Sequence, residues 1–271
     1  MKLAVSHIGW PVEKNEEILP RLIEEGVEGL EIAPSKLWED TWNISFFQVE
    51  NLRKEVERYG LKIVGLHALL YDHPELCLFK GKDAEIKSVD FLAGLGKLCS
   101  DLGGKTLVFG SGPNRRRGQI PVENAMDIAV GFFSKVSEKM LENEVCLCIE
   151  PLGSNETDFI DSAEQALRLI KRVDHEGFRG QLDTKSLYAA NEINVPLFEA
   201  FRKYLVHVHI NDPGLVELGS TGLVNHEKIG KLLKHINYDR FVSIEQKTVC
   251  IEDPFKAVLN SIKEAKRCYL A

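Results

Sequence analysis

The segment KYLVHVHINDPG, residues 203–214, joins an apolar run to side chains that bind metals and move protons. His207 and His209 are two residues apart, so on a β-strand both side chains point to the same face. A single buried histidine is commonly a hydrogen-bonded core residue. Two histidines on one face, close to the end of the run, predict that this strand ends at a ligand-binding site.

Three further apolar runs end in a carboxylate. VCLCIE ends at Glu150, RGQLD at Asp183 and FVSIE at Glu245, while LVHVH ends at His209. Each of these groups alone is compatible with a satisfied polar residue in the core. Three carboxylates at one level would repel one another and lose their hydration unless a cation neutralised them. We therefore predict a single divalent metal ion with these ligands: Glu150, Asp183, His209 and Glu245.

The donor set narrows the choice of metal. Three carboxylates and one imidazole suit Mn²⁺, Mg²⁺ or Co²⁺, and Zn²⁺ is less favoured. Four protein ligands leave two positions for waters or for adjacent substrate oxygens, an arrangement that polarises a carbonyl and stabilises an enediolate. The six cysteines are scattered without a CxxC pair, so we expect them to be reduced and to form no zinc–thiolate site.

Eight short apolar runs alternate with helix-period segments and are expected to position these side chains. The predicted strands are 3–6, 29–32, 61–66, 106–109, 145–149, 179–182, 205–208 and 241–244. Residues 122–141 carry one apolar stripe at helical spacing. Asp161 and Glu164 resemble the capping box that begins a helix.

Eight strand–helix alternations in a chain of 271 residues predict a (β/α)8 TIM barrel. No linker or shift in composition divides the chain, so we expect one domain over residues 1–271. An open doubly wound sheet is the alternative, and it is less favoured because no GxGxxG or P-loop opens a helix. In a barrel, the carboxyl ends of all strands meet on one face, where active sites are built.

Composition restricts the partners. The net charge is −7, from 34 basic and 41 acidic side chains, and it opposes nucleic-acid or anionic-membrane binding. No run has the apolar length of a membrane span, and the first ten residues, MKLAVSHIGW, lack the apolar region of a secretory signal. We expect a cytoplasmic protein that acts on a small molecule.

The segments CIEPLGSNE, QLDT, HVHINDPG and VSIEQ, in this order, resemble the sugar phosphate isomerase/epimerase superfamily of xylose isomerase-like TIM barrels. The resemblance runs along essentially the whole chain, and VFGSGPNRR and GSTGLVNHEKIGKLL add to it. It is nearest to the ketose 3-epimerases and hydroxypyruvate isomerase. The superfamily also includes inosose dehydratase and endonuclease IV.

The resemblance implies roles for individual residues. Glu150 and Glu245 would be both metal ligands and a general acid/base pair on opposite faces of the substrate, through an enediolate. Asp183 and His209 would be ligands only. Glu156, six positions beyond the first ligand, corresponds to a glutamate that contacts substrate. His207 would orient His209, contact substrate or serve as a core residue.

The sequence departs from the epimerase pattern at positions that contact the substrate, so the substrate is expected to be bound differently. Ser186 stands three residues after the aspartate ligand, where the epimerases have histidine, and Leu215 stands where they have arginine. Lys185 shares the strand parity of Asp183. It would bind a substrate carboxylate or phosphate, pair with a site glutamate, or point into solvent. A 3-epimerase of free ketoses is therefore not assumed.

Other side chains are candidates for the pocket wall. His67 ends the third strand and would donate a hydrogen bond to a sugar hydroxyl or be a buried structural residue. Glu31 ends the second strand, and the same two roles are open to it. Arg115, the first residue of the 115–117 arginine run, would bind phosphate bidentately or be solvated. The early loops also carry three tryptophans, which would cover a sugar ring or, as is commoner, be exposed aromatics that cap a helix: Trp10, Trp38 and Trp42.

The leading hypothesis is a metal-dependent isomerase or epimerase of a small keto-sugar, sugar acid or sugar phosphate. A dehydratase of an inosose-like ketose, with Lys185 as the distinguishing acid, is the first alternative. An endonuclease-like hydrolase would need further histidines, including one in place of Ser186, and a non-catalytic sugar-binding barrel is a further alternative. Family members are often homo-oligomers, but no stripe in this sequence identifies an interface.

Overall fold

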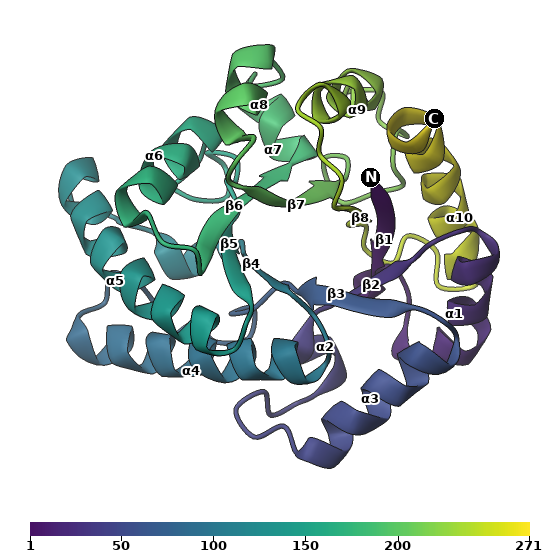
Figure 1. Cartoon of the computed structure of the whole chain (residues 1–271), viewed down its shortest axis with the longest axis horizontal. Helices are drawn as coiled ribbons and strands as arrows, with labels where there is room; N and C mark the ends of the chain where they lie inside the picture. Colours follow the sequence, from purple (N-terminus) through teal and green to yellow (C-terminus); the bar gives the residue numbers. More distant parts are fainter.

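Eight parallel strands form a closed barrel in which each strand pairs with its neighbours in sequence and β1 pairs with β8 (Figure 1). This is a computed structural model, and it describes residues 1–271. The fold predicted from the sequence, a (β/α)8 barrel, is confirmed. The strands are β1 (Lys2–Ser6), β2 (Gly29–Ile32), β3 (Lys62–Leu66), β4 (Thr106–Phe109), β5 (Cys146–Ile149), β6 (Phe178–Asp183), β7 (Leu205–Ile210) and β8 (Phe241–Ile244).

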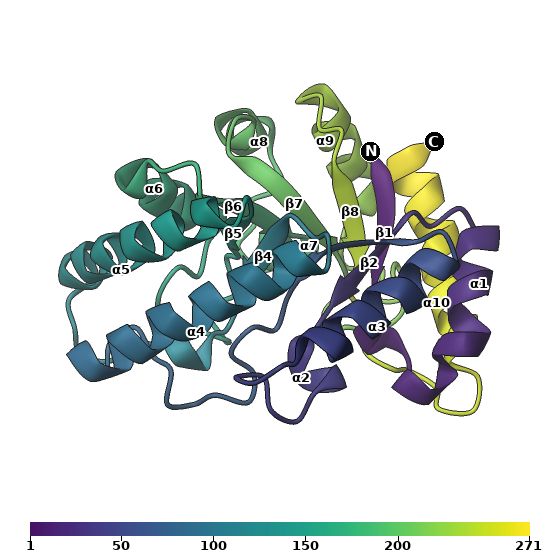
Figure 2. The same ribbon diagram turned by 60° about the horizontal axis from the view of Figure 1, so that its bottom comes forward.

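Helices surround the strands on the outside (Figures 1 and 2). They are α1 (Asn15–Glu24), α2 (Pro34–Leu37), α3 (Phe46–Arg58), α4 (Lys82–Asp101), α5 (Val122–Glu142), α6 (Ala163–Val173), α7 (Thr184–Ala189), α8 (Val195–Phe201), α9 (His226–His235) and α10 (Pro254–Ala265). A π-helical turn, Lys266–Leu270, continues α10 and packs against α9. None of the helices combines the length and the apolar character that crossing a membrane requires.

The start of α6 differs from the expected capping box. Ser162, one residue later than expected, is the N-cap: its hydroxyl accepts the backbone N–H of Gln165, and its backbone is extended, as an N-cap requires. Asp161 instead accepts a hydrogen bond from the side-chain amide of Gln165 at 2.7 Å. The expected capping box at Asp161 and Glu164 is therefore wrong by one residue.

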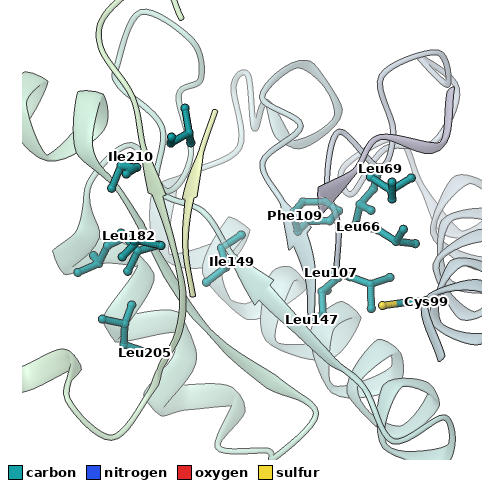
Figure 3. Close-up of a cluster of buried hydrophobic side chains, with 14 of the residues drawn as sticks. Leu66, Leu69, Cys99, Leu107, Phe109, Leu147, Ile149, Leu182, Leu205 and Ile210 are labelled. Carbon is teal, nitrogen blue, oxygen red and sulfur yellow. The ribbon is translucent and has the colours of Figure 1, made fainter. Parts of the chain in front are cut away.

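The apolar core lies between the outer face of the barrel and the helices. Figure 3 shows Leu66, Leu107 and Cys99 in one cluster between two strands and α4. Farther along the barrel, the rings of Phe133 on α5 and Phe178 on β6 stack with centroids 4.6 Å apart. Close packing of this kind holds the strands in fixed register, so side chains at the strand ends are positioned by the core rather than by flexible loops.

The inside of the barrel is polar at mid-height. TIM barrels usually fill this space with branched apolar side chains. Here five polar residues are buried in it: Ser6, Glu31, Gln181, His207 and Ser243. Because a buried polar group is costly without a partner, this layer predicts a hydrogen-bond network directed towards the face that carries the site.

Two helical glycines provide a test of the helix packing. A methyl group on Gly230 of α9 would collide with the main-chain carbonyl of Cys268, whereas one on Gly131 of α5 would meet no atom within 4 Å. We expect Gly230→Ala to lower the free energy of unfolding by about 1–3 kcal/mol through overpacking. Gly131→Ala should raise it by about 0.5–1 kcal/mol, because alanine favours the helix. Urea unfolding measures both, and equal effects would contradict this account.

Candidate metal centre and active site

The four predicted metal ligands converge at the carboxyl ends of the last four strands. Glu150 follows β5, Asp183 ends β6, His209 lies in β7 and Glu245 follows β8. Their ligand atoms all lie within 4.8 Å of one another. Pairing of Asp183 with His209 in the sheet brings the second and third ligands side by side.

The imidazole of His209 lies between the two glutamates. Its Nδ1 is 3.3 Å from Glu150 Oε1 and 3.5 Å from Glu245 Oε2. The side chains of Asp183 and His209 are fully buried, while those of Glu150 and Glu245 are 8% and 13% exposed. The two glutamates are thus the ligands that a molecule entering from the mouth would meet.

A fourth carboxylate, Glu31 of β2, supports His209 from below. His209 Nε2 lies 3.0 Å from Glu31 Oε2, and the hydroxyl of Ser243 donates to the same oxygen at 2.7 Å. His207 Nε2 lies 3.0 Å from the other oxygen, Oε1. Glu31 therefore holds the Nε2 side of His209, so Nδ1 is the ring nitrogen that faces the other carboxylates and would bind a metal after losing its proton.

The electrostatics of the cluster follow from burial and from this geometry. Burial alone would lower the pKa of His209, but the carboxylates of Glu31 and Glu245 raise it well above its ordinary value. Burial raises the pKa of Glu150. It acts in the same direction on Glu245, where His209 reverses the effect and holds the pKa well below the usual range. The carboxylates thus surround this position with negative charge, which favours a cation there.

Two further polar residues orient the ligands, and sequence reasoning missed both. The amide of Asn211 donates to Asp183 Oδ2 at 2.6 Å and to Glu245 Oε2 at 2.8 Å. The amide of Gln181 donates to Glu150 Oε1 at 3.4 Å. Each stands two residues from a ligand on the same strand path, Gln181 before Asp183 and Asn211 after His209, so strand parity was the signal that could have found them.

The residues present fit a divalent ion. Three carboxylates and one imidazole that presents its Nδ1 form a donor set typical of octahedral ions. Gly110, at the end of β4, leaves room for this arrangement, because a methyl group there would collide with Glu150 Oε2. The ligands Glu150, Asp183, His209 and Glu245 would hold the ion.

Above the ligands the structure opens into two adjoining cavities of about 360 and 440 Å³. His67, Glu245 and Leu215 line both. Glu150, Glu156 and Lys185 line the smaller one. A molecule in this mouth would therefore contact both of the glutamates that the sequence predicts as acid and base.

Lys185 points into the mouth. Its Nζ lies 3.1 Å from Glu156 Oε1 and 3.7 Å from Asp183 Oδ1, and its side chain is 14% exposed. Burial would lower the pKa of Lys185, but Asp183 and then Glu150 raise it above the ordinary value. The expectation that Lys185 points into solvent is wrong. Instead, Lys185 forms an ion pair with Glu156, a glutamate of the site.

The remaining predicted histidines lie at different depths. His67 Nε2 pairs with the hydroxyl of Ser6 at 2.7 Å, and its Nδ1 lies 3.4 Å from Glu245 Oε1, so it reaches the mouth beside a ligand. His207 lies one layer lower, 1% exposed, against Glu31. It does not line the mouth, so of its three expected roles the substrate contact is not supported.

The prediction that Arg115 binds substrate is wrong. Its side chain is fully buried and donates to the main-chain carbonyls of Phe109 at 3.3 Å and Ile160 at 3.2 Å. Arg116 donates to the carbonyl of Glu156, and Arg117 to that of Asp158. The arginine run instead fastens the loop after β5, which carries Glu156, to the loop after β4.

Two of the tryptophans do not line the mouth, so the sugar-covering role is not supported for them. Trp10 is fully buried, and its indole N–H donates to Asn15 at 2.9 Å. Trp42 packs against Phe91 of α4, with ring centroids 4.7 Å apart. Loop residues face whichever side the loop turns to, and sequence position alone did not determine that side.

A family model described as the xylose isomerase-like TIM barrel matches residues 19–268. The chain belongs to this family. The resemblance inferred from the strand-end motifs is thereby confirmed.

Two relatives match parts of the chain. A Metamycoplasma arthritidis (strain 158L3-1) protein, provisionally named endonuclease 4, is 25% identical over 134 residues, which are 46% of this chain and 47% of that protein. A Danio rerio protein, provisionally named hydroxypyruvate isomerase, is 32% identical over 106 residues, which are 36% of this chain and 37% of that protein. The chain thus spans less than half of each relative.

Solved structures match over the whole barrel. D-psicose 3-epimerase with D-tagatose, from Clostridium cellulolyticum H10, has a TM-score of 0.82 at 16% identity, with 99% of each chain covered. The IOLI protein with a bound zinc atom has a TM-score of 0.79 at 18% identity, with 100% of each chain covered. At these identities the likeness establishes the fold.

The support that Glu31 gives to His209 leads to a prediction. We expect Glu31→Gln to weaken divalent-metal binding about 10–100-fold, because a neutral amide holds the Nε2–H of His209 less strongly. Titration of the metal-free protein with Mn²⁺ would measure this. Glu138→Gln, on the exposed face of α5, is the matched control and should bind the metal as the parent does. Equal affinity in Glu31→Gln would remove Glu31 from the site.

Proposed function

We propose that this protein is a divalent-metal-dependent isomerase or epimerase of a small keto-sugar. The observation that carries the proposal is the position of two carboxylates, Glu150 and Glu245, which lie 3.3 and 3.5 Å from His209 Nδ1 and both line the mouth. Two carboxylates that approach a substrate from different sides can remove a proton beside its carbonyl and return one elsewhere. The names of the similar proteins, a ketose 3-epimerase and a hydroxypyruvate isomerase, agree with this chemistry.

In this proposal each residue of the mouth has a separate task. One glutamate takes the proton from the carbon beside the substrate carbonyl, giving an enediolate, and the other donates a proton to it. Asp183 and His209 complete the ligand set for one ion per chain, with Mn²⁺, Mg²⁺ or Co²⁺ favoured over Zn²⁺ by the donor chemistry. When bound, such an ion would polarise the carbonyl and offset the charge that develops on its oxygen.

Polar contacts to the substrate would come from three residues around the ligands, and an apolar contact from a fourth. Glu156 and Lys185 form an ion pair at the mouth, and each can exchange part of that contact for a sugar hydroxyl. His67 lies beside Glu245, where one of its ring nitrogens can meet a substrate oxygen. Leu215 supplies an apolar wall where the epimerases have arginine, so the far end of the substrate is held differently.

A dehydratase is the second candidate, and the position of Lys185 favours it. Its ammonium group lies within 3.7 Å of a ligand carboxylate, Asp183, so it is close enough to protonate a hydroxyl that leaves from the carbon next to the site of proton removal. Both reactions begin with the same proton transfer. A product lighter by one water would select the dehydratase, and a product of unchanged mass would select the isomerase.

We expect both catalytic carboxylates to be required for proton exchange. Incubation with ketoses such as D-fructose or D-tagatose in D₂O should label the carbon beside the carbonyl, as followed by NMR. Glu150→Gln and Glu245→Gln should each slow the labelling by about 10²–10⁴-fold, because the amide cannot accept the proton. Glu138→Gln should label at the parent rate. The proposed mechanism is wrong if neither site variant slows exchange in a sample shown to hold the ion.

Metal content separates the proposal from an endonuclease-like hydrolase. Only two groups of side chains could hold an ion, and both contain His209, so we expect one ion per chain. Removal of the ion by EDTA should abolish exchange, and Mn²⁺ should restore it. In addition, a serine, Ser186, stands where a multi-metal site would need a histidine. Three tightly held ions per chain, or cleavage of DNA at abasic sites, would favour the hydrolase instead.

A further inference from the structure

The opposite, amino-terminal end of the barrel contains a separate cavity of about 550 Å³. Four cationic side chains stand at its rim, each at the start of a different strand. Lys2 and Lys62 begin β1 and β3, while Lys105 and Arg240 immediately precede β4 and β8. Asp239 is the only acidic residue of the lining. The cavity shares no lining residue with the mouth above the metal ligands.

These cations are not neutralised by the chain. None of them forms an ion pair with a carboxylate, although the protein as a whole carries a net charge of −7. Lys105 makes only a long contact, 3.4 Å, to the carbonyl of Glu144, and Lys2 lies 5.8 Å from the centre of the Phe241 ring. One concavity therefore carries four cations without an ion-pair partner.

The cavity extends into the barrel instead of ending at the rim. Val64, Thr106 and Val206 form its buried walls, and the imidazole of His207, 1% exposed, lies at its inner end. Nε2 of His207 lies near Glu31 without the geometry of a hydrogen bond. His207 and Glu31 form the layer that separates this cavity from the metal ligands. The amino-terminal cavity is therefore a second compartment of the same barrel.

A concave surface with low-dielectric walls and charges of one sign concentrates its electrostatic potential and attracts the opposite charge. Lysine ammonium and arginine guanidinium groups are the usual partners of phosphate oxygens, and arginine contacts two oxygens at once. The four cations stand along one arc of the opening, from β8 through β1 and β3 to β4. A tetrahedral polyanion can contact several of them together, whereas a planar monocarboxylate can contact fewer.

We propose that the amino-terminal cavity binds a small phosphate-class anion, either inorganic phosphate or the phosphoryl group of a small metabolite. This site lies at the end of the barrel opposite the mouth and does not depend on the proposed activity. The anion would lie at the rim among Lys2, Lys62 and Arg240. Any remaining part of the molecule would extend inwards towards Thr106 and His207.

The test measures binding of inorganic phosphate and of glycerol 3-phosphate to the full chain by calorimetry, at low ionic strength and without metal. We expect one saturable site per chain. The double variant Lys62→Ala/Arg240→Ala should weaken binding at least about tenfold. The matched control is Lys87→Ala/Lys228→Ala, which removes the same charge from exposed positions on α4 and α9 and should bind as the parent does. Tighter binding of phosphate identifies the free ion, and tighter binding of glycerol 3-phosphate identifies a phosphoryl group.

A second measurement uses the unaltered protein, so its result does not depend on whether the variants fold. Amide chemical shifts, followed during the phosphate titration, should change at Thr106 and His207 and remain fixed at Glu150 and Lys185. The proposal is overturned if no saturable binding occurs, if both double variants lose affinity equally, or if the shifts change at the mouth instead.

Discussion

The structure depends on keeping negative charge buried around one imidazole. Glu31, Glu150 and Asp183 are all buried, Glu245 is nearly so, and His209 is placed among them. Two unit charges about 4 Å apart interact by about 4 kcal/mol at an effective dielectric constant of 20, so the carboxylates would push the strand ends apart if nothing opposed them. His209 and the amides of Gln181 and Asn211 oppose this repulsion within the chain. The same repulsion would be relieved by a divalent cation bound among these carboxylates.

This constraint explains why the barrel interior departs from the usual apolar filling. His209 can present Nδ1 to the ligand cluster only if Nε2 is held from the other side, and Glu31 holds it there. A buried glutamate then needs partners of its own. Ser243 donates a hydrogen bond to one oxygen, and His207 Nε2 lies 3.0 Å from the other. The polar layer at mid-height is thus a consequence of the site above it. The apolar packing that stabilises the fold is moved to the outer face of the strands, as Figure 3 shows.

The strands and the four converging side chains could be predicted because a parallel barrel converts position in the sequence into position in space. Glu150, Asp183 and Glu245 each end an apolar run, and every such run ends on the same face. The contact between Glu31 and His209 could not be predicted, because the two residues are 178 positions apart and nothing in the sequence links them. The direction of Arg115 could not be predicted either, because it depends on how its loop folds over the carbonyl of Ile160.

The two ends of the barrel show how the same residue type acquires different chemistry. Lys185, next to the metal ligands, is already matched by Glu156 and Asp183, so an anionic substrate group would have to displace a carboxylate to reach it. Lys62 and Arg240, at the other end, have no such partner, and an anion that binds there displaces only water. We therefore expect the mouth to favour uncharged polyol groups. Charged phosphate groups should favour the amino-terminal cavity, even though both compartments lie inside one acidic protein.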